Sequence, residues 1–380
     1  MNIKSLLLGS AAALIAVSGA RAADAVVVAE PEPAEYVKIC DVYGAGYFYI
    51  PGTETCLRIG GYVRYDISAG EEGSFDGART FDNMDGTDQD TWHKQARFAL
   101  KTWTGQETEL GTLKTYTETR FNFGNGSGGV ASNLNGGDNT AVSLNFAWIQ
   151  LGGLRVGKDE SAFNTFIGYA GNVIQDTLVP YGDFDTNVVQ YYFDAGNGFS
   201  AVVSLEEGSG AVGTIDSYVP HVVGGVKYTQ GWGAITGVVS YDSNYEEVAG
   251  KVRLDVNASD ALSLWVMGGY GTDNNLNDDA NNVVDAFGRG FYKQWGGNWA
   301  VWGGGTYKLN EKTSLNLQVS YDEWKEFGLA ANVAYDIVPG LTITAEVDWA
   351  HATKFGPSWT GIPAGKSNAI GGILRFQRSF

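Results

Sequence analysis

The sequence is poor in the residues on which several classes of protein depend. Among 380 residues it has only two cysteines, three histidines, three methionines and eight prolines. The histidines are His93, His221 and His351, and none stands in a metal-ligand spacing or beside a serine motif. With 25 basic against 43 acidic residues the formal charge is −18, which argues against nucleic acid as a partner. We therefore expect no enzyme activity, no cofactor, no metal site and no nucleic-acid binding.

Long apolar runs are missing after residues 1–22. No later stretch approaches the roughly 18 consecutive apolar residues of a transmembrane helix. Residues 1–22 combine Lys4, a short apolar run and small residues before Ala23, which is typical of a secretory signal peptide. We predict cleavage before Ala23; losing Lys4 and Arg21 changes the formal charge from −18 to −20. No cysteine follows the cleavage site, so we expect an exported protein that is not lipidated.

Glycine and aromatic residues are abundant instead. The chain has 53 glycines, about double the usual share of roughly 7%, and 20 Tyr, 18 Phe and 11 Trp. Apolar and polar residues also alternate strictly in many segments, as in LTITAEVDW (341–349). Such alternation predicts strands with one apolar face and one polar face that carries charges. We predict an all-β protein.

Sixteen such segments can be marked along the chain. The connections between them alternate between short turns, the first around Gly105, and mostly long polar loops, a pattern that describes an up-and-down antiparallel meander. The predicted strands cover 55–68, 92–103, 111–122, 140–151, 154–158, 187–195, 199–206, 221–229, 233–241, 247–257, 262–270, 298–307, 314–322, 327–336, 341–349 and 368–380.

The charged faces decide between two β architectures. A water-soluble sandwich would have to hide both charged faces, whereas a closed barrel in lipid turns its apolar face outward and its charged face toward a watery lumen. About sixteen strands leave an interior too wide for side chains to fill. We predict a transmembrane antiparallel β-barrel over residues 55–380, with long external loops and short periplasmic turns, preceded by a periplasmic leader over 23–54.

Several stretches resemble one family. The block EYVKICDVYGAGYFYIPGTETCLRIGGYVRYD, the PEP at 31–33, the strand pattern and the terminal strand AIGGILRFQRSF, which ends on Phe380, are similar to alphaproteobacterial porins. The likeness covers the whole predicted mature chain, is most specific over 36–66, and is close to the major outer-membrane porins of Brucella and rhizobia. It implies a homotrimer of sixteen-stranded barrels that pass small hydrophilic solutes. It also implies that the third external loop folds inward to narrow the pore.

The third long connection here is residues 159–186, rich in apolar residues. It lacks the Pro-Glu-Phe-Gly turn of enterobacterial porins; Val179-Pro180-Tyr181-Gly182 is the nearest match. Basic residues on the polar strand faces would oppose its acids and set up a transverse field, unless they are ordinary lumen residues paired with local acids. The predicted acidic residues are Asp159, Glu160, Asp176, Asp183 and Asp185, and the predicted basic wall residues are Arg64, Arg97, Arg120, Arg155 and Arg375.

The two cysteines predict one disulfide. Cys40 and Cys56 are separated by 15 residues, and in an oxidising compartment their bridge would contribute about 3 kcal/mol. The aromatic stretch between them, 43–52, could lie against the periplasmic end of the barrel or form a second constriction. The sequence is compatible with both positions.

Three further segments suggest partners. The loops 82–90 and 273–282 are rich in oxygen ligands; solvated acidic loops are favoured over calcium sites, and divalent cations could bridge them to lipopolysaccharide. The leader 23–35 begins Ala23-Asp24, a start proposed in related envelope barrels to be attached to peptidoglycan.

These patterns predict a general-diffusion porin in the outer membrane, a passive channel with weak cation selectivity. Two alternatives stay open at this point. One is a structural barrel that anchors the outer membrane to peptidoglycan through a nearly closed pore. The other is a sugar-specific porin, which an aromatic ladder would mark; Tyr62, Tyr116 and Trp265 are scattered candidates.

Overall fold

The computed structural model describes residues 38–70, 77–125, 138–272, 290–352 and 367–380. Contacts divide the chain into residues 1–38 and 39–380, and every described strand belongs to the second unit. The predicted signal peptide, the start of the leader and the acidic run 273–282 lie outside the described residues. They stay predictions.

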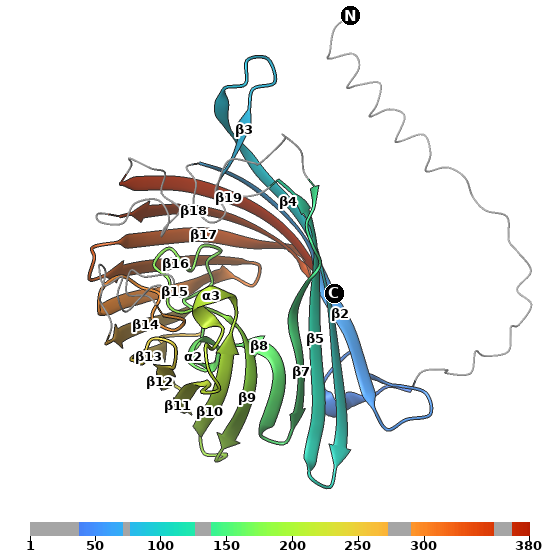
Figure 1. Cartoon of the computed structure of the whole chain (residues 1–380). Helices are drawn as coiled ribbons and strands as arrows, with labels where there is room; N and C mark the ends of the chain where they lie inside the picture. Colours follow the sequence, from blue (N-terminus) through green and yellow to red (C-terminus); the bar gives the residue numbers. More distant parts are fainter. Residues whose placement is uncertain (1–37, 71–76, 126–137, 273–289, 353–366) are drawn as a thin grey trace, which may run out of the picture. The chain divides into compact units, whose positions relative to one another are not determined.

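Among the described residues, sixteen antiparallel strands form a closed barrel (Figure 1). Each pairs with the next along the chain, and the last pairs with the first, with Leu374 opposite Ile67. The predicted sixteen-stranded barrel is confirmed. Its strands are β2 (Cys56–Gly70), β4 (Asp88–Thr108), β5 (Gly111–Gly124), β7 (Ser143–Leu151), β8 (Leu154–Glu160), β9 (Asp185–Asp194), β10 (Phe199–Gly208), β11 (His221–Gln230), β12 (Gly233–Asp242), β13 (Glu247–Asn257), β14 (Leu262–Gly271), β15 (Trp299–Asn310), β16 (Thr313–Asp322), β17 (Phe327–Val338), β18 (Leu341–His351) and β19 (Asn368–Ser379).

The barrel is apolar outside and polar inside. On β18, Val347 is 59% exposed, whereas the carboxylates Glu346 and Asp348 between the apolar positions are 3% and 1% exposed. A soluble sandwich would show the opposite. The alternation therefore places hydrocarbon toward lipid and charge toward the lumen, as expected for a barrel in a membrane.

The two ends of the barrel differ in their connections. Turns of two to four residues join the strand pairs at one end, such as 152–153 and 339–340, and most connections at the other end are long. The first short turn lies at 109–110, so its prediction near Gly105 was wrong. Gly105 lies inside β4, where a side chain would come within 2.6 Å of the Tyr43 ring. This glycine therefore marks a close approach and no turn.

Short elements extend the ends of the barrel. At the long-loop end, β3 (Gly77–Phe81) pairs with β4 as a hairpin, and β6 (Asp138–Asn139) pairs with β5. At the other end, β1 (Phe48–Tyr49) pairs with the start of β2. The helical elements η1 (Asp41–Tyr43), α2 (Ala162–Thr165) and α3 (Gly210–Gly213) are single turns. None of the helices in the described ranges is long and apolar enough to cross a membrane.

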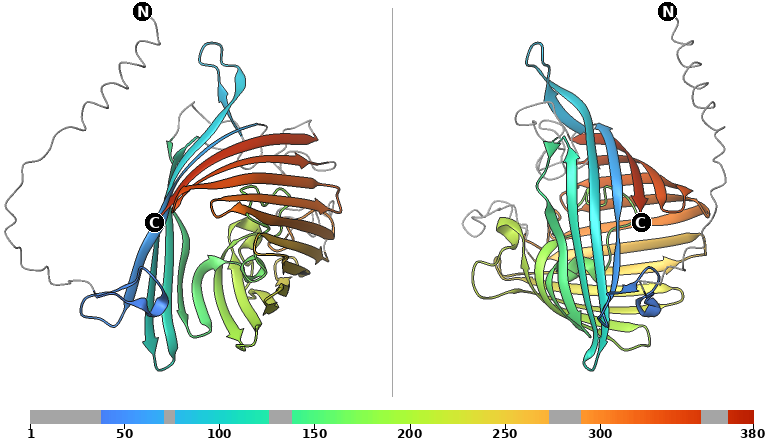
Figure 2. Two further views of the ribbon diagram at one scale, coloured as in Figure 1. Left: turned by 180° about the vertical axis from the view of Figure 1, so that it is seen from behind. Right: turned by 90° about the vertical axis from the view of Figure 1, so that its right-hand side faces the viewer.

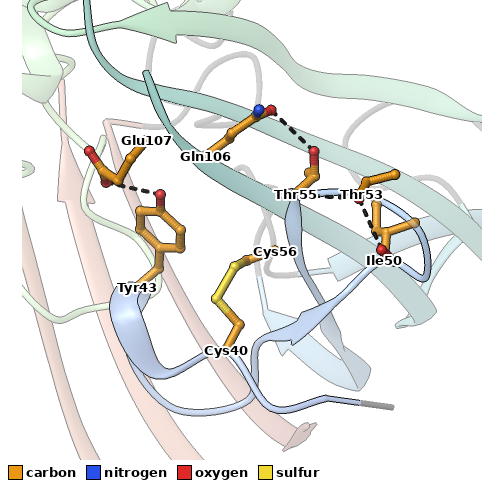
Figure 3. Close-up of a disulfide and its surroundings, with 8 residues drawn as sticks. All are labelled: Cys40, Tyr43, Ile50, Thr53, Thr55, Cys56, Gln106 and Glu107. Atoms are coloured by element: carbon orange, nitrogen blue, oxygen red, sulfur yellow. Dashed lines mark hydrogen bonds between the residues drawn. A yellow bond between two sulfur atoms is a disulfide. The ribbon is translucent and has the colours of Figure 1, made fainter. Parts of the chain in front are cut away.

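The predicted disulfide joins Cys40 to Cys56, with the two Cα atoms 6.0 Å apart (Figure 3). It closes residues 41–55 into a segment that we call the disulfide loop. Tyr43 donates a hydrogen bond to Glu107 at 2.9 Å, and Thr55 donates one to Gln106 at 3.2 Å. The disulfide loop therefore lies against the short-turn end of β4.

Candidate functional site

Residues 161–184, which we call the inward segment, connect β8 to β9 inside the barrel. Figure 1 shows this connection, including α2, within the curve of the sheet. Ser161 begins α2 by accepting a hydrogen bond from the Phe163 amide at 3.1 Å. The prediction of 159–186 as one loop was too wide by two residues at each end, because the ladder between β8 and β9 continues to the pair Glu160–Asp185.

The inward segment packs by its apolar side chains against the wall. Gly225 on β11 leaves room for Phe166, because a side chain there would come within 2.8 Å of that ring. Near the other end of the segment, Leu178 packs against Ala330 and Ala350. The segment is thus held by burial on both sides. Its residues in the larger cluster are Ala162, Phe163, Phe166, Ile167, Ala170, Val179 and Tyr181, and the wall contributes Val202, Val223, Val238, Ala249, Trp265, Met267, Ala300 and Trp302.

Two buried wall carboxylates hold backbone amides of the inward segment. Glu346 on β18 accepts hydrogen bonds from the Ile174 and Gln175 amides at 2.6 and 2.7 Å. Glu206 on β10 accepts one from the Ala162 amide at 2.9 Å and one from the Ser161 hydroxyl at 2.7 Å. Hydrogen bonds to an ionised acceptor are stronger than neutral ones. Both halves of the segment are therefore fixed.

Two basic residues on β13 also hold the segment, Lys251 near both of its ends and Arg253 at Tyr169. The Lys251 ammonium, fully buried, donates to Asn164 Oδ1 at 2.6 Å and to the Tyr181 carbonyl at 2.7 Å. It also lies 4.0 Å from the centre of the Phe163 ring. Arg253 donates to the Tyr169 carbonyl at 2.5 Å. Sequence reasoning assigned no role to these residues; their one signal was a place on the polar face of a predicted strand.

A second stretch, residues 290–298 between β14 and β15, also folds into the lumen. Phe291, Tyr292 and Trp295 are fully buried in the same cluster as the inward segment. Tyr292 donates a hydrogen bond to Glu206 at 3.0 Å, and the Asp183 amide donates to the Phe291 carbonyl at 3.0 Å. The sequence predicts a polar loop here, so the inward packing of these aromatic residues is a difference between prediction and structure.

Four of the five predicted arginines pair with nearby acids. Arg375 and Arg64 share Asp66, Arg375 through two hydrogen bonds of 2.8 and 3.0 Å and Arg64 at 3.3 Å. Arg120 pairs with Glu118 at 2.7 Å. Within the described residues Arg97 has no carboxylate partner, and its Nε donates to an asparagine, Asn122, at 2.7 Å. Arg155 lies nearer the short turn between β7 and β8 and pairs with Asp159 at 2.7 Å.

The structure brings part of the predicted basic set together. Arg375 lies opposite Asp66 in the ladder of β19 and β2, Arg64 opposite Arg97 in that of β2 and β4, and Arg120 follows on β5. Figure 2 shows β2, β4 and β5 on the other side of the barrel from β11 to β15, where the larger apolar cluster of the inward segment packs. β19 borders β18, which also holds the segment through Glu346. Arg64, Arg97 and Arg120 therefore lie on strands across the barrel from that cluster, and Arg375 lies between them and β18.

The predicted acids are more dispersed than the sequence suggested. Asp159 and Glu160 belong to β8; Glu160 accepts a hydrogen bond from Tyr169, and Asp185 in β9 pairs with Lys158. Only two of the five predicted acids, Asp176 and Asp183, lie in the inward segment.

Burial shapes the ionisation of the two segment acids. Burial raises the pKa of Asp176 to about 6, although the hydrogen bond from Tyr181 at 2.6 Å favours the ionised form. Burial also raises the pKa of Asp183, against the hydrogen bond that its carboxylate accepts from the Phe184 amide at 2.8 Å. Desolvation disfavours the charged form of an acid, which explains both directions.

A family model described as the porin subfamily matches residues 24–373. The porin Omp2b of Brucella suis biovar 1 is 53% identical over 388 residues, covering all of both chains, and Omp2b of Brucella neotomae is equally similar. The chain belongs to the porin subfamily. It is therefore a multi-pass β-barrel of the bacterial outer membrane that forms a passive, water-filled channel for small hydrophilic solutes and ions.

Solved structures share the fold of this porin. The outer membrane channel DcaP of Acinetobacter baumannii has a TM-score of 0.61 at 16% identity, covering 87% of this chain and 99% of that one. An anion-selective porin from Comamonas acidovorans has a TM-score of 0.51 at 14% identity, covering 86% and 100%. At these identities the likeness concerns the barrel alone.

The histidines of this porin lie in structural positions. His221 is fully buried, and its Nδ1 faces both the Ser243 hydroxyl at 3.2 Å and Asp242 at 3.4 Å, while its Nε2 lies 3.0 Å from the Gly213 carbonyl. A catalytic triad needs the serine and the acid on opposite ring nitrogens. His93 lies within β4, and His351 ends β18.

The three candidates for an aromatic ladder, Tyr62, Tyr116 and Trp265, make separate contacts. Tyr116 stacks with Trp103 at 5.3 Å, Tyr62 lies beneath Lys101 at 5.4 Å, and Trp265 lies beneath Arg253 at 4.5 Å. The two candidates on β2 and β5 therefore do not form one ladder with Trp265 on β14.

The loop 82–90 contains the tip of the hairpin formed by β3 and β4. Asp82 accepts a hydrogen bond from the Met84 amide at 2.7 Å, and Asp85 accepts one from the Thr87 amide at 2.9 Å. These carboxylates thus stabilise the turn itself.

Proposed function

We propose that the inward segment and the facing basic wall form the narrowest part of the diffusion channel, with the predicted acids and arginines as its charged lining. The observation that carries the proposal is the fixed position of the segment, which wall residues on several strands hold by hydrogen bonds. A segment held at this many points narrows the lumen permanently and does not act as a mobile lid.

The charges around this constriction favour weak selectivity. The facing wall carries five cations against two carboxylates: Arg64, Arg97, Lys101, Arg120 and Arg375 against Asp66 and Glu118. The predicted mature chain as a whole carries −20. An acidic protein with a basic wall at its narrowest point attracts cations to its mouth and opposes them inside, so we propose a small preference for cations.

Covalent modification inside the channel tests the constriction. Both native cysteines are in the disulfide, so Asn172→Cys on the exposed face of the inward segment introduces a single free thiol. Attaching a bulky cationic thiosulfonate there should lower single-channel conductance by more than half. The matched control, Asn197→Cys in the exposed turn between β9 and β10, should leave conductance unchanged. Equal conductance after modification of both variants would contradict the constriction.

We propose that the barrels associate as a homotrimer through the outer face of β4 and β5. Thr102 and Thr104 alternate in phase with the outward Phe98, and they hydrogen-bond to Thr117 at 2.5 Å and Thr115 at 2.6 Å on β5. Small side chains with satisfied hydroxyls suit close contact with a neighbouring barrel better than contact with lipid.

A bulky substitution tests this outer face. Thr117→Trp should convert the trimer to monomers in native mass spectrometry. The control is Val203→Trp on the outer face of β10, where Val203 is 58% exposed. This control variant should remain a trimer. A trimer that persists in Thr117→Trp would exclude β4 and β5 as the interface.

Two further partners follow from the acidic loops 82–90 and 273–282 and from the leader 23–35. We propose that acidic external loops bind lipopolysaccharide phosphates through divalent cations, and that Ala23 or Asp24 is attached to peptidoglycan. A digest of peptidoglycan that yields no peptide from this end of the chain would contradict the attachment.

We also propose that this porin catalyses no reaction. The support is the arrangement at His221, whose serine and acid face one ring nitrogen while the other lies against a backbone carbonyl. Turnover of an ester by the purified barrel, lost in His221→Gln, would contradict this proposal.

A further inference from the structure

A cavity of about 320 Å³ lies between the inward segment and the inner face of β13 to β15. Two of its residues, Asn257 and Ser263, flank the short turn between β13 and β14, so the cavity is on the short-turn side of the segment. Its volume is at the lower end of the range for small-molecule sites, roughly 300–1,000 Å³. The polar and aromatic residues that line it include Tyr169, Asn172, Asp255, Asn257, Ser263 and Thr306.

The charges at this cavity cancel. The Arg253 guanidinium binds Asp255 through Nε at 2.9 Å and through Nη2 at 2.7 Å, and its third nitrogen donates to the Tyr169 carbonyl. It also lies over the Trp265 ring at 4.5 Å. Because the arginine is fully engaged and paired with its acid, the cavity presents no net charge. An ion gains little electrostatic binding energy at such a site, whereas a neutral polar molecule meets no charge repulsion there.

The cavity offers hydrogen-bonding groups that the fold does not use. Asn172 donates through Nδ2 to Thr306 at 2.9 Å, and within the described residues its Oδ1 accepts no hydrogen bond. The Asn257 Oδ1 and the Ser263 hydroxyl likewise have no bonded partner in the described part of the chain. All three side chains are exposed, so each can bind an incoming hydroxyl group in place of water.

Aromatic surface borders the same groups. Tyr169 is 43% exposed at the cavity. A pyranose ring has C–H groups on its faces and hydroxyl groups around its edge. It can therefore lie against an aromatic side chain while its edge reaches the amide and hydroxyl groups of the wall.

We propose that this cavity is a weak binding site for one neutral pyranose unit inside the channel. The inference rests on the proposed constriction, since the inward segment supplies one side of the site. Occupancy narrows the open path, so a bound sugar lowers the ion current while it stays.

Single-channel recording with D-glucose and D-sorbitol tests the site. The two solutes have nearly equal mass, but sorbitol is a linear polyol without a ring face. Glucose should reduce the current along a saturating curve, whereas sorbitol should reduce it only in proportion to viscosity. The double variant Asn172→Ala/Ser263→Ala removes two neutral hydrogen bonds, each worth about fivefold in affinity, so half-saturation should rise about 25-fold. Asn197→Ala, in an exposed turn outside the cavity, is the control and should match the wild type.

The outcomes separate this proposal from the constriction. Glucose-specific saturation that the double variant weakens supports the site. Equal effects of glucose and sorbitol, or unchanged half-saturation in the double variant, overturn the site. If thiol modification at position 172 still blocks the channel in that case, the constriction stands. If that modification has no effect, the constriction falls and the site falls with it.

Discussion

Replacing Lys251 by methionine should loosen the inward segment and leave the barrel folded. The substitution keeps most of the hydrocarbon stem but removes the ammonium that donates to Asn164 and Tyr181 and lies over Phe163. Each of these charged hydrogen bonds contributes about 1.5–3 kcal/mol, and part of that sum offsets the cost of burying the ammonium. A net loss of about 2 kcal/mol raises the population of displaced segment about 30-fold. The strand ladders of β13 are untouched, so the barrel should keep its heat resistance.

The assay is the fluctuation of the open-channel current in planar bilayers, with Lys227→Met as the matched control. Lys227 is on β11, two strands away from β13, and lies 5.2 Å from the centre of the Phe166 ring. Within the described residues it therefore touches the same segment by a ring contact alone. The open-channel current should fluctuate more than in the wild type only in Lys251→Met. Equal fluctuation in the two variants would refute the reasoning that Lys251 holds the segment.

Three further perturbations have defined outcomes. Burial raises the pKa of Asp176 to about 6, so its carboxyl is neutral at pH 5 and ionised at pH 7.5; the cation-to-anion permeability ratio should rise between these pH values and stay level in Asp176→Asn. A ratio that rises equally in both proteins contradicts this assignment. Replacing Cys40 and Cys56 by serine should remove about 3 kcal/mol of protection from amide exchange in the disulfide loop while conductance stays unchanged; conductance that falls in parallel would show that this loop supports the channel. Arg97→Ser should shift the ratio toward cations at no cost in heat resistance, since Arg97 pairs with no carboxylate in the described ranges; an unchanged reversal potential would exclude this arginine from the lining.

Asp176 also makes the stability of the inward segment depend on pH. The folded protein binds the proton of Asp176 more tightly than the unfolded chain, whose ordinary pKa is 3.8. The contribution of the Asp176 carboxyl to the free energy of unfolding is therefore fully present below about pH 4 and is lost as the pH rises toward about 6. The protection factors of the amides in the inward segment, which are corrected for the pH dependence of the intrinsic exchange rate, should fall across this interval in the wild type but not in Asp176→Asn.

The barrel was predictable because its sequence signal, the alternation of apolar and polar residues, lies within each strand. Strict alternation in a strand such as β18 places Glu346 and Val347 on opposite faces whatever the rest of the chain does. The position of Gly105 was not predictable in this way. Its reason, the Tyr43 ring, comes from a segment 62 residues earlier in the sequence.

The channel lining was only partly predictable, since it depends on contacts between distant segments. The apolar residues of the inward segment were recognisable as a group in one loop. The pairing of Lys251 with Asn164, 87 residues apart, leaves no pattern in a single sequence. The same holds for Phe291 and its neighbours, whose aromatic character alone could not show that they pack inside the lumen.

The most direct test of the account is single-channel conductance of the purified, folded protein in planar bilayers, with the reversal potential measured under a salt gradient. The account predicts ohmic current steps, grouped in threes, and a reversal potential of the sign for weak cation preference. A folded barrel that inserts but conducts no current would contradict a water-filled channel and would favour a structural barrel with a closed lumen.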